Sequence, residues 1–546
     1  MSFQFVPASK VRLDSFNQLR EDFKEVVDDN EKHFDRRVYF KKGDGDGEGT
    51  EYYPYMFSKT LPHDEVTGFP KKDDVEKLVK AWKYGGAYLD DVVQDDASER
   101  KLEGIAASNS FAMMGQDSTV PSAPAEFYPA VDSEQGIFEM GEVYARSLVR
   151  DIPFHQYANP VDDTVSRLMV DLNNFGEKGT APTVGGNITT GTFLRGHSLG
   201  EEVGPYVSQF LYLPYKYGNL PITQKYLVEQ DVADSTVYAE WLKLQRGVKP
   251  TPVVPDPSVE PEQKYAYCSR VLGSKVHSDP MYQFYYQAAL IASQNGIGAE
   301  FGGSAKSSSW TSGGGPNILA SVAHVALGAL RVAWHQKWGV SMMIRPEVIA
   351  QRIQLAYNGE LDVPGFKNIK NLCDKMPDIL AMVNSRNTGD LTDPNYLLNL
   401  QFPEGSPTHP SRPAGHSTVA AACVTVLKAM LKTHDADGLL SWPSAVKHSL
   451  TGVNLDNYDG VTAGMTIVGE FNKLASNVAL ARDGAGVHQR TDWALGQRVG
   501  EDFAISYLVD VAKELSESQN EQFSGWTLSK FDGVNVKITS EGVVPI

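Results

Sequence analysis

Apolar residues recur at three- and four-residue intervals through most of the chain after about residue 135. This spacing places apolar side chains along one face of an α-helix. Helices are predicted at 136–154, 161–175, 281–296, 316–338, 345–359, 417–434 and 488–518. The later segments are too apolar to stand alone, so we expect them to pack as a bundle.

The two ends of the chain differ from this helical centre. The first 120 or so residues are mixed, polar and rich in turns, and the segment 524–542 alternates around an Asp-Gly turn as a hairpin does. The pattern predicts a mainly α fold, a large helical bundle with small β-hairpins. It also predicts an irregular and helical segment packed on the core (1–125), a bundle domain (126–520) and a hairpin tail (521–546).

Composition narrows the choice of partners. The chain has 546 residues and a net charge of −18, from 50 basic and 68 acidic residues. Such a charge repels nucleic acid and anionic membranes, so we expect neither as a partner. Neither an apolar leader nor a run of about 18 apolar residues is visible, which favours a soluble protein without a membrane span. The compartment stays open, with the cytoplasm as one expectation.

The cysteines carry no visible chemistry. Cys268, Cys373 and Cys423 are far apart, odd in number and without CxxC spacing. We expect buried free thiols and neither a disulfide framework nor a zinc site.

The first candidate for chemistry is the start of the helix at 417–434. Pro413, Gly415 and His416 stand where a Pro-rich turn ends and this helix begins. Unpaired backbone N–H groups at a helix start bind anions, and glycine lets the backbone come close to a ligand. His416 can exchange a proton near neutral pH. The alternative is an ordinary helix start with a polar residue near its cap.

A second cluster lies at a helix end and contains Lys337, Arg345 and Pro346. Two fixed positive charges flank an apolar turn, and the proline opens the next helix. Lys337 follows a long apolar stretch. It either extends to solvent or serves a buried anion.

A third cluster precedes the last long helix. Arg482 is followed six residues later by His488. A positive charge on a histidine is disfavoured at a helix N-terminus, so the neutral form of His488 can act as a ligand or a nucleophile. Asp492, one helical turn further on, could orient the ring.

Together the three clusters favour one kind of ligand. They supply three cations, two histidines and two helix N-termini. The side chains concerned are Lys337, Arg345, Arg482, His416 and His488. This set suits a tetrahedral oxyanion, whereas a small neutral substrate needs no such charges.

In this order and spacing the motifs resemble those of the vanadium-dependent haloperoxidases. That family shares its anion pocket with the type 2 phosphatidic acid phosphatase superfamily. The eight-residue step from Lys337 to Arg345 and the stretch EGSPTHPSRPAGH at 404–416, with His409, are most similar to the algal-type bromoperoxidases. The resemblance covers roughly residues 130–510, and the missing leader would suit a bacterial or cyanobacterial member.

The resemblance implies vanadate as the cofactor. His488 would bind vanadium through a ring nitrogen, and His416 would be the acid–base group. The other groups around the vanadate oxygens would be Lys337, Arg345, Arg482 and the backbone N–H of Gly415, with His409 beside the pocket.

The family's reaction is the oxidation of halide, here most readily bromide, by hydrogen peroxide. Lys337 would polarise the bound peroxide. The hypohalous acid released halogenates small organic substrates with little selectivity. Relatives form homo-oligomers that are built from dimers and reach dodecamers.

Two positions depart from the family pattern. Ala414 stands where relatives have a serine that donates to a vanadate oxygen, and Arg412 stands where they often have an aromatic residue. Losing one hydrogen bond to a charged group costs about 1.5–3 kcal/mol. We therefore expect weaker vanadate binding or a lower rate unless another donor replaces the hydroxyl.

The pocket residues do not separate this reading from an acid phosphatase, in which His488 would form a phosphohistidine and His416 would protonate the leaving group. A non-catalytic oligomeric shell protein is a third reading, but it leaves the convergent charges unexplained. The expected pocket walls, which would set halide preference, are Trp334, Gln336, Trp338 and Phe402.

Overall fold

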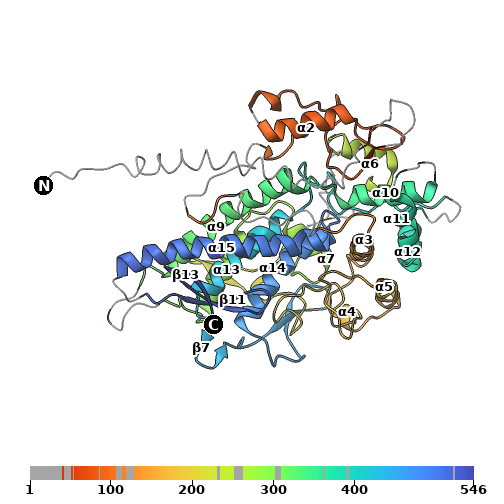
Figure 1. The fold of residues 1–546 in the computed structure, drawn as a ribbon. Helices are drawn as coiled ribbons and strands as arrows, with labels where there is room; N and C mark the ends of the chain where they lie inside the picture. The colour runs from red at the N-terminus through yellow and green to blue at the C-terminus, as the bar shows by residue number, and fades with distance from the viewer. Residues whose placement is uncertain are drawn as a thin grey trace.

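The computed structural model describes most of the chain (Figure 1). The residues it describes are 40–41, 51–52, 54–84, 86–105, 114–118, 128–229, 234–250, 262–301, 306, 309–359, 361, 363, 365–388, 393–519 and 523–546.

Helices dominate these residues, as predicted. They are α2 (Lys72–Tyr84), α3 (Glu134–Leu148), α4 (His155–Ala158), α5 (Thr164–Asn173), α6 (Tyr238–Gln245), α7 (Ser269–Lys275), α8 (Gln283–Gln294), α9 (Gly315–His335), α10 (Pro346–Asn358), α11 (Phe366–Cys373), α12 (Pro377–Asn387), α13 (Gly415–Met430), α14 (Ile467–Gly484) and α15 (Arg490–Gln519). A π-helical turn, η7 (Gln336–Ser341), continues α9, and short 3-10 turns lie at Gly86–Leu89, Gln209–Leu211 and Asp234–Thr236.

The centre of the bundle is α13, which packs against α9, α14 and α15. Every residue of α13 except His416 is buried. In Figure 1 the four helices form one layered group, with the long α15 and α9 running beside α13. A helix covered on all sides needs apolar residues all round, which explains why the segment after Gly415 is so rich in alanine and valine.

Each of the seven predicted helices is present, with ends shifted by a few residues. Proline opens two of them, because Pro316 and Pro346 lie in the first turns of α9 and α10. The prediction did not place the other seven described helices, and the longest of these is α14. Its whole length is buried, polar Glu470, Asn472 and Lys473 included. A buried helix with polar residues on several sides has no clear apolar stripe.

Strands are short and local. They are β1 (Phe40–Lys41), β2 (Glu51–Tyr52), β3 (Tyr215–Tyr217), β4 (Leu220–Ile222), β5 (Tyr226–Leu227), β6 (Gln263–Lys264), β7 (His434–Asp435), β8 (Gly438–Leu439), β9 (Val446–His448), β10 (Leu455–Asn457), β11 (Trp526–Ser529), β12 (Asn535–Thr539) and β13 (Gly542–Pro545). All pairs are antiparallel, and all but the last three strands form two-stranded pairs.

The predicted C-terminal hairpin is present and gains a third strand. Strands β11 and β12 flank a turn that contains Asp532 and Gly533, and β13 adds to the other edge of β12. The sheet packs on α13 and α15, with Trp526 and Ile538 buried. The final strand was missed because GVVP is short and lies at an exposed edge.

Part of the N-terminal region packs on the bundle. The backbone N–H of Phe57 donates to the carbonyl of Met342 at 2.6 Å. The buried ammonium of Lys59 donates to the carbonyl of Ser406 at 2.6 Å and lies 3.4 Å from the carboxylate of Glu347. Residues before α2 are therefore anchored to the loop that precedes α13.

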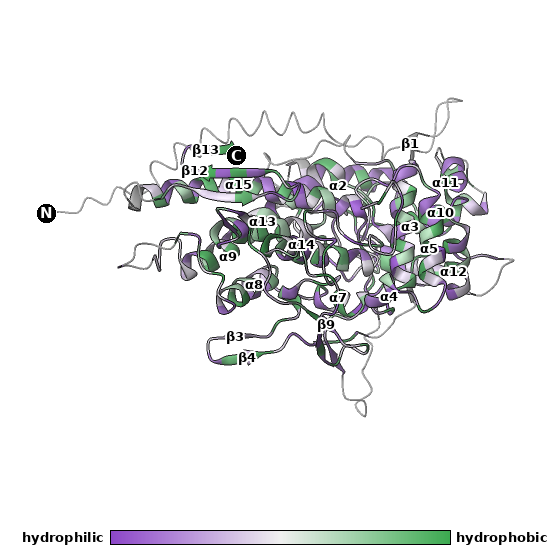
Figure 2. Cartoon of the chain, turned by 90° about the horizontal axis from the view of Figure 1, so that it is seen from below, coloured by the Kyte–Doolittle hydropathy of each residue, from purple (hydrophilic) through white to green (hydrophobic). Residues whose placement is uncertain are grey.

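One helix among the described residues is long and apolar enough to cross a membrane by composition alone. It is α9 with η7, Gly315–Ser341, and half of its most apolar window is buried inside the protein. It packs against α8, α13 and α15. Figure 2 shows its apolar surface running alongside α13. A core helix of a bundle has this character, so the helix gives no clear membrane span.

Candidate active site

A cavity of about 280 Å³ opens beside the N-terminus of α13. Its lining is rich in charged and aromatic side chains: Arg100, Glu103, His277, Asp279, Met281, Trp334, Phe402, Glu404, Gly405, Pro407, His409, Gly415, His416, Arg482 and His488. We call it the cationic cavity. It brings together five of the predicted site residues, namely His409, Gly415, His416, Arg482 and His488.

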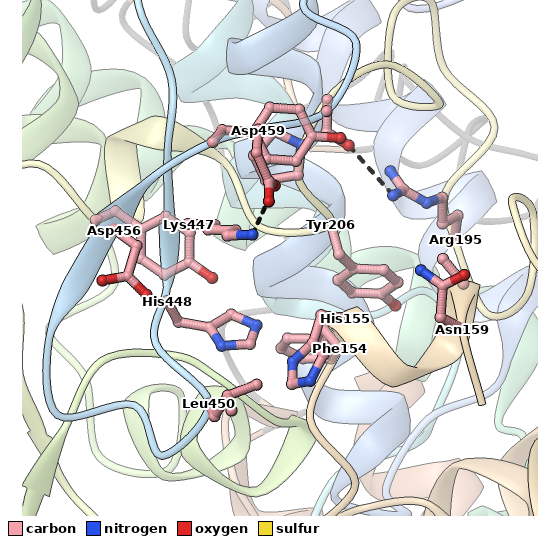
Figure 3. Close-up of a pocket in the computed structure, with 16 residues that line it drawn as sticks. Phe154, His155, Asn159, Arg195, Tyr206, Lys447, His448, Leu450, Asp456 and Asp459 are labelled. Carbon is pink, nitrogen blue, oxygen red and sulfur yellow. Dashed lines mark hydrogen bonds and ion pairs between the residues drawn. The ribbon is translucent and has the colours of Figure 1, made fainter. Parts of the chain in front are cut away.

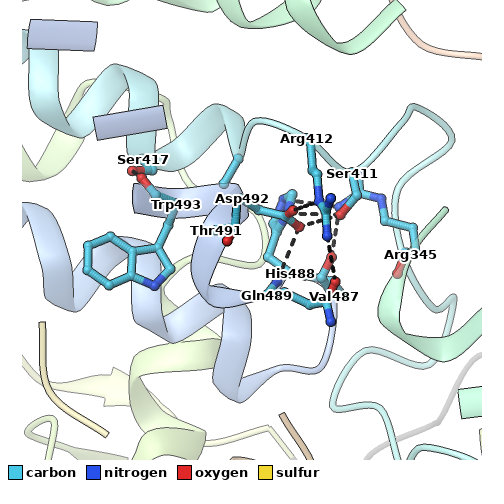
Figure 4. Close-up of polar contacts among 12 residues, drawn as sticks. Arg345, Ser411, Arg412, Ser417, Val487, His488, Gln489, Thr491, Asp492 and Trp493 are labelled. Atoms are coloured by element: carbon cyan, nitrogen blue, oxygen red, sulfur yellow. Dashed lines mark hydrogen bonds and ion pairs between the residues drawn. The ribbon is translucent and has the colours of Figure 1, made fainter. Parts of the chain in front are cut away.

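His488 lies at the floor of the cavity and is held in one tautomer (Figure 4). Its Nδ1 is 3.0 Å from a carboxylate oxygen of Asp492, and its Nε2 is 3.0 Å from Nη1 of Arg345. A guanidinium can only donate, so Nε2 accepts and Nδ1 carries the proton. Burial and the charge of Arg345 push the pKa of His488 well below its usual value. The ring is neutral, with its lone pair on Nε2.

Asp492 is itself held from several sides (Figure 4). The hydroxyl of Ser411 and the Nε of Arg412 donate to it at 2.5 and 3.0 Å, and the backbone N–H of Gln489 donates at 3.2 Å. Burial alone would raise the pKa of Asp492, but the His488 hydrogen bond and the Arg412 charge hold it far below its usual value. The carboxylate stays ionised and fixes the ring.

This arrangement settles where Arg412 points. Its guanidinium also donates to the carbonyl of Pro129 at 3.0 Å and lies over the ring of Tyr128 at 5.5 Å. Arg412 is buried behind His488 and is absent from the cavity lining. It therefore neutralises Asp492 and adds no charge to the cavity wall.

His416 forms a second histidine–carboxylate pair at the cavity wall. Its Nε2 is 2.8 Å from an oxygen of Asp279. Burial lowers the pKa of His416 and the Asp279 carboxylate opposes this effect. Asp279 precedes α8, and no pattern in the sequence indicates that it meets the start of α13.

Lys337 and Arg345 lie behind the lining and turn their donors onto the loop before α13. The ammonium of Lys337 donates to the carbonyls of Pro410 and Ser411 at 2.8 and 2.7 Å. Arg345 donates to the carbonyl of His409 at 3.1 and 3.0 Å. Both side chains are buried. Burial, followed by the charge of Arg345, lowers the pKa of Lys337 well below its usual value.

Arg482 reaches the cavity with an unused donor. Its Nη1 donates to the carbonyl of Val276 at 2.7 Å, and the guanidinium lies over the ring of Phe402 at 5.0 Å. Its buried Nε has no hydrogen-bond partner among the described residues. Burial lowers the pKa of Arg482 to about 10. A buried cation with an unpaired N–H is costly, so a ligand that accepts there would stabilise the site.

Gly415 is required for space. A Cβ at this position would lie 3.1 Å from the Trp334 ring, which is held by a hydrogen bond from its Nε1 to the carbonyl of Glu103. The lining includes the predicted wall residues Trp334 and Phe402 but not Gln336 or Trp338. Trp338 packs edge-on against Phe57, with ring centroids 5.5 Å apart. Its Nε1 donates to the carbonyl of Glu103 at 3.1 Å, so the ring lies against the N-terminal residues rather than in the lining.

His409 also borders the cavity. Its Nδ1 accepts from Nη2 of Arg345 at 3.0 Å, and its Nε2 is 3.6 Å from a carboxylate oxygen of Glu103. The ring lies against Trp334, with centroids 4.5 Å apart. Burial and the charges of Lys337 and Arg345 lower the pKa of His409 well below its usual value.

A fourth histidine in the lining, His277, was not predicted. The two nitrogens of His277 each lie 2.6 Å from a carboxylate, one of Glu229 and one of Glu404. The ring is stacked on Phe402 at 3.9 Å. Burial acts to lower the pKa of His277, but the two carboxylates raise it to about 9. The cavity wall thus holds an imidazolium that is already paired.

The cavity has the chemistry of an oxyanion site. Arg345 and Arg482 lower the pKa of Lys337, so these cations crowd one another. An anion beside the unpaired Nε of Arg482 would relieve that crowding. Among the described residues no group of three or more His, Cys, Asp and Glu side chains forms a metal cluster. A single histidine with surrounding cations is therefore the feature to explain.

Comparison with known proteins agrees with the resemblance inferred from the motifs. The relatives that it finds support an enzyme of the haloperoxidase class. The chain is 29% identical to vanadium-dependent bromoperoxidases of Corallina pilulifera and Corallina officinalis, over 88% and 90% of its length and 90% and 92% of theirs. It is 27% identical to a vanadium-dependent bromoperoxidase of Ascophyllum nodosum, over 90% of this chain and 87% of that one. No family model matches the chain.

Comparison with solved structures also finds a bromoperoxidase. The structure of the homohexameric second vanadate-dependent bromoperoxidase of Ascophyllum nodosum superposes with a TM-score of 0.80 at 24% identity, covering 89% of this chain and 84% of that one. The resemblance to the vanadium-dependent bromoperoxidases, inferred from the motifs, is confirmed, and so is the mainly helical fold.

Proposed function

We propose that the protein oxidises halide, with bromide preferred, by hydrogen peroxide in a vanadate-dependent reaction that releases hypohalous acid. The observation that carries this proposal is the neutral, tautomer-fixed His488 at the floor of a cavity with a buried, unpaired Arg482 donor. Small organic compounds would then be halogenated. The bromoperoxidase names of the relatives support this choice over a phosphatase on a similar pocket.

The residues present fit vanadate. His488 would hold the metal through Nε2, the one nitrogen whose lone pair faces the cations. The oxygens would be held by Lys337, Arg345, Arg482 and the backbone N–H of Gly415. For Lys337 and Arg345 this requires sharing or exchanging hydrogen bonds that now go to backbone carbonyls, and Nη1 of Arg345 must release Nε2 of His488. Bound vanadate would supply a Lewis acid that makes peroxide electrophilic without a change of metal oxidation state.

The chain's own groups would move protons and exclude water. His416 is neutral because burial lowers its pKa. Its Nε2 donates to Asp279, so Nδ1 would accept the proton from peroxide, and Asp279 would stabilise the imidazolium. Lys337 would polarise the peroxide oxygen. Trp334 and Phe402 would narrow the space for halide. His409, between Arg345 and Glu103, would adjust the charge beside it.

Assembly and layout follow the same analogy. We propose a homo-oligomer, since the structural relative is a hexamer by its description. Dimers as the building unit and a dodecamer as the upper size remain part of this proposal. The division of the chain at about residues 125 and 520 is also part of this proposal. A cytoplasmic location is another part of it.

Bromination of a phenolic dye with peroxide and bromide, with and without vanadate, tests the function. We expect vanadate-dependent bromination that excess phosphate suppresses, because phosphate competes for the same cations. Chloride and iodide in place of bromide rank the halides. Hydrolysis of a phosphomonoester that vanadate inhibits, together with no bromination, would overturn the proposal in favour of the acid phosphatase.

A further inference from the structure

A second cavity, of about 460 Å³, lies between α4, the segment before the 3-10 turn at Gln209–Leu211, and the strands β9 and β10 (Figure 3). Its lining is Phe154, His155, Ala158, Asn159, Arg195, Gly204, Pro205, Tyr206, Tyr212, Lys447, His448, Leu450, Asp456, Tyr458, Asp459 and Gly460. We call it the aromatic cavity. It shares no lining residue with the cationic cavity, and neither the motifs nor the proposed reaction uses it.

Aromatic rings make one side of this cavity. Phe154 and Tyr206 stack at 4.3 Å with an angle of 9° between their planes. His448 stands at a steep angle to both Phe154 and Tyr212, with centroids 6.5 and 6.4 Å away. Figure 3 shows the rings of Phe154, Tyr206 and His448 around one opening. Flat walls set at an angle accept a further aromatic ring by stacking on one and meeting the edge of the other.

His448 offers a hydrogen-bond acceptor in this wall. Its Nδ1 is 2.9 Å from the carbonyl of Ser449 and therefore carries the proton. Its Nε2 is then the lone-pair nitrogen, and it has no hydrogen-bond partner in the described part of the chain. Burial lowers the pKa of His448 to about 4. The ring is neutral and only 6% exposed, so the acceptor is fixed.

Arg195 offers a positive charge without a carboxylate partner. Its guanidinium donates to the carbonyl of Glu201 at 2.8 Å and, more weakly, to that of Gly204 at 3.4 Å. It lies 5.2 Å above the Tyr206 ring. Lys447, by contrast, is paired with Asp459 at 2.6 Å at the solvent-exposed mouth. Arg195 therefore covers the outer face of the Tyr206 ring, and the outer face of Phe154 is the one left to a ligand.

We propose that the aromatic cavity binds a small neutral phenol, with its ring on the Phe154–Tyr206 stack and its hydroxyl donating to Nε2 of His448. An aromatic carboxylate fits less well because it cannot donate to Nε2 and would meet Asp456 and Asp459. This inference concerns binding only and stands whether or not the protein oxidises halide.

The test compares phenol with anisole, its methyl ether, which keeps the ring and lacks the donor. Both are titrated against the full-length protein by ligand-observed NMR without peroxide, once with vanadate saturating the cationic cavity and once without. We expect saturable binding, phenol about three- to tenfold tighter than anisole, and no effect of vanadate. Equal affinities, displacement by vanadate or non-saturable binding of phenol would each overturn the proposal.

A substitution at the acceptor sharpens the result. His448→Phe keeps an aromatic wall and removes Nε2, so the ratio of phenol to anisole affinity should fall to about one. A general loss of packing would weaken both ligands and leave the ratio unchanged. Lys447→Ala at the mouth is the matched control, because its side chain is 30% exposed and faces Asp459. It should keep the ratio of the unsubstituted protein, and a ratio that changes there as much as in His448→Phe would contradict the assignment.

Discussion

The cavity floor and the cavity wall each contain a histidine paired with an aspartate, and the two pairs are built differently. At the floor, His488 and Asp492 are 2% and 0% exposed, while at the wall His416 and Asp279 are 17% and 3% exposed. The floor aspartate receives donors from a serine, an arginine and the backbone. The second oxygen of Asp279 has no partner among the described residues.

This difference separates two tasks for the same pair of residue types. A ligand must keep one lone pair in one direction, which many surrounding hydrogen bonds achieve. A proton-transfer group must exist in both protonation states, so its partner should stabilise the charged form without locking the neutral one. The floor pair meets the first requirement and the wall pair meets the second.

Removal of the floor histidine should have the largest effect. We expect His488→Ala to lose vanadate binding by more than the roughly 100-fold that loss of an outer-shell partner costs, and to lose bromination with it. Equilibrium dialysis of vanadate and the dye assay measure the two. His324→Ala, on the exposed side of α9, is the control. If His488→Ala held vanadate as tightly as the control, His488 would not be the ligand.

The second largest effect should come from the ion pair of Arg412 and Asp492, and it should appear in the free energy of unfolding. Asp492→Asn leaves Arg412 buried without its counter-charge, so the free energy of unfolding should fall by about 3–5 kcal/mol. The double substitution with Arg412→Met should recover part of this loss. Denaturant unfolding measures each corner of the cycle. Additive losses in the double variant would show that the two side chains are not coupled.

The wall pair should respond mainly in its pH dependence. Asp279 opposes the effect of burial and so raises the pKa of His416. Without that charge the pKa of His416 falls further, and its neutral form survives to lower pH. Asp279→Asn should therefore move the acidic limb of kcat/KM to lower pH, by roughly one unit or more, with vanadate affinity nearly unchanged. A shift to higher pH would contradict the role given to Asp279.

The sequence allowed both histidines to be predicted, but only the aspartate of the floor pair. Gly415 and His416 begin α13. Arg482 lies near the end of α14 and His488 just before α15, and there motif spacing and helix polarity indicate an anion site. Asp492 lies four residues after His488, so helical geometry alone suggested their contact. These are local relations, and the structure shows the predicted pairing.

The partners that were missed are distant in sequence. Asp279 meets His416 across 137 residues, and Glu404 meets His277 across 127. The sequence does not decide whether Arg412 points into the cavity or away from it, because its direction depends on how α15 packs against the loop before α13. Periodicity fixes the face of a helix but does not say which loops converge on its end.

The smallest expected effect concerns the position where relatives carry serine. Ala414 is fully buried and clusters with Ala479, Leu480 and Trp493, and it is absent from the cavity lining. It is also the N-cap of α13, with no side-chain hydrogen bond.

In Ala414→Ser the hydroxyl should accept from an N–H of the first turn and raise the free energy of unfolding by about 1 kcal/mol. Vanadate affinity should change by less than about threefold, since a hydroxyl bound to the backbone does not reach the floor. Equilibrium dialysis beside denaturant unfolding separates the two effects. A tenfold gain in vanadate affinity would mean that the hydroxyl turns toward the cations, and that the floor of this cavity lacks a donor that only this position supplies.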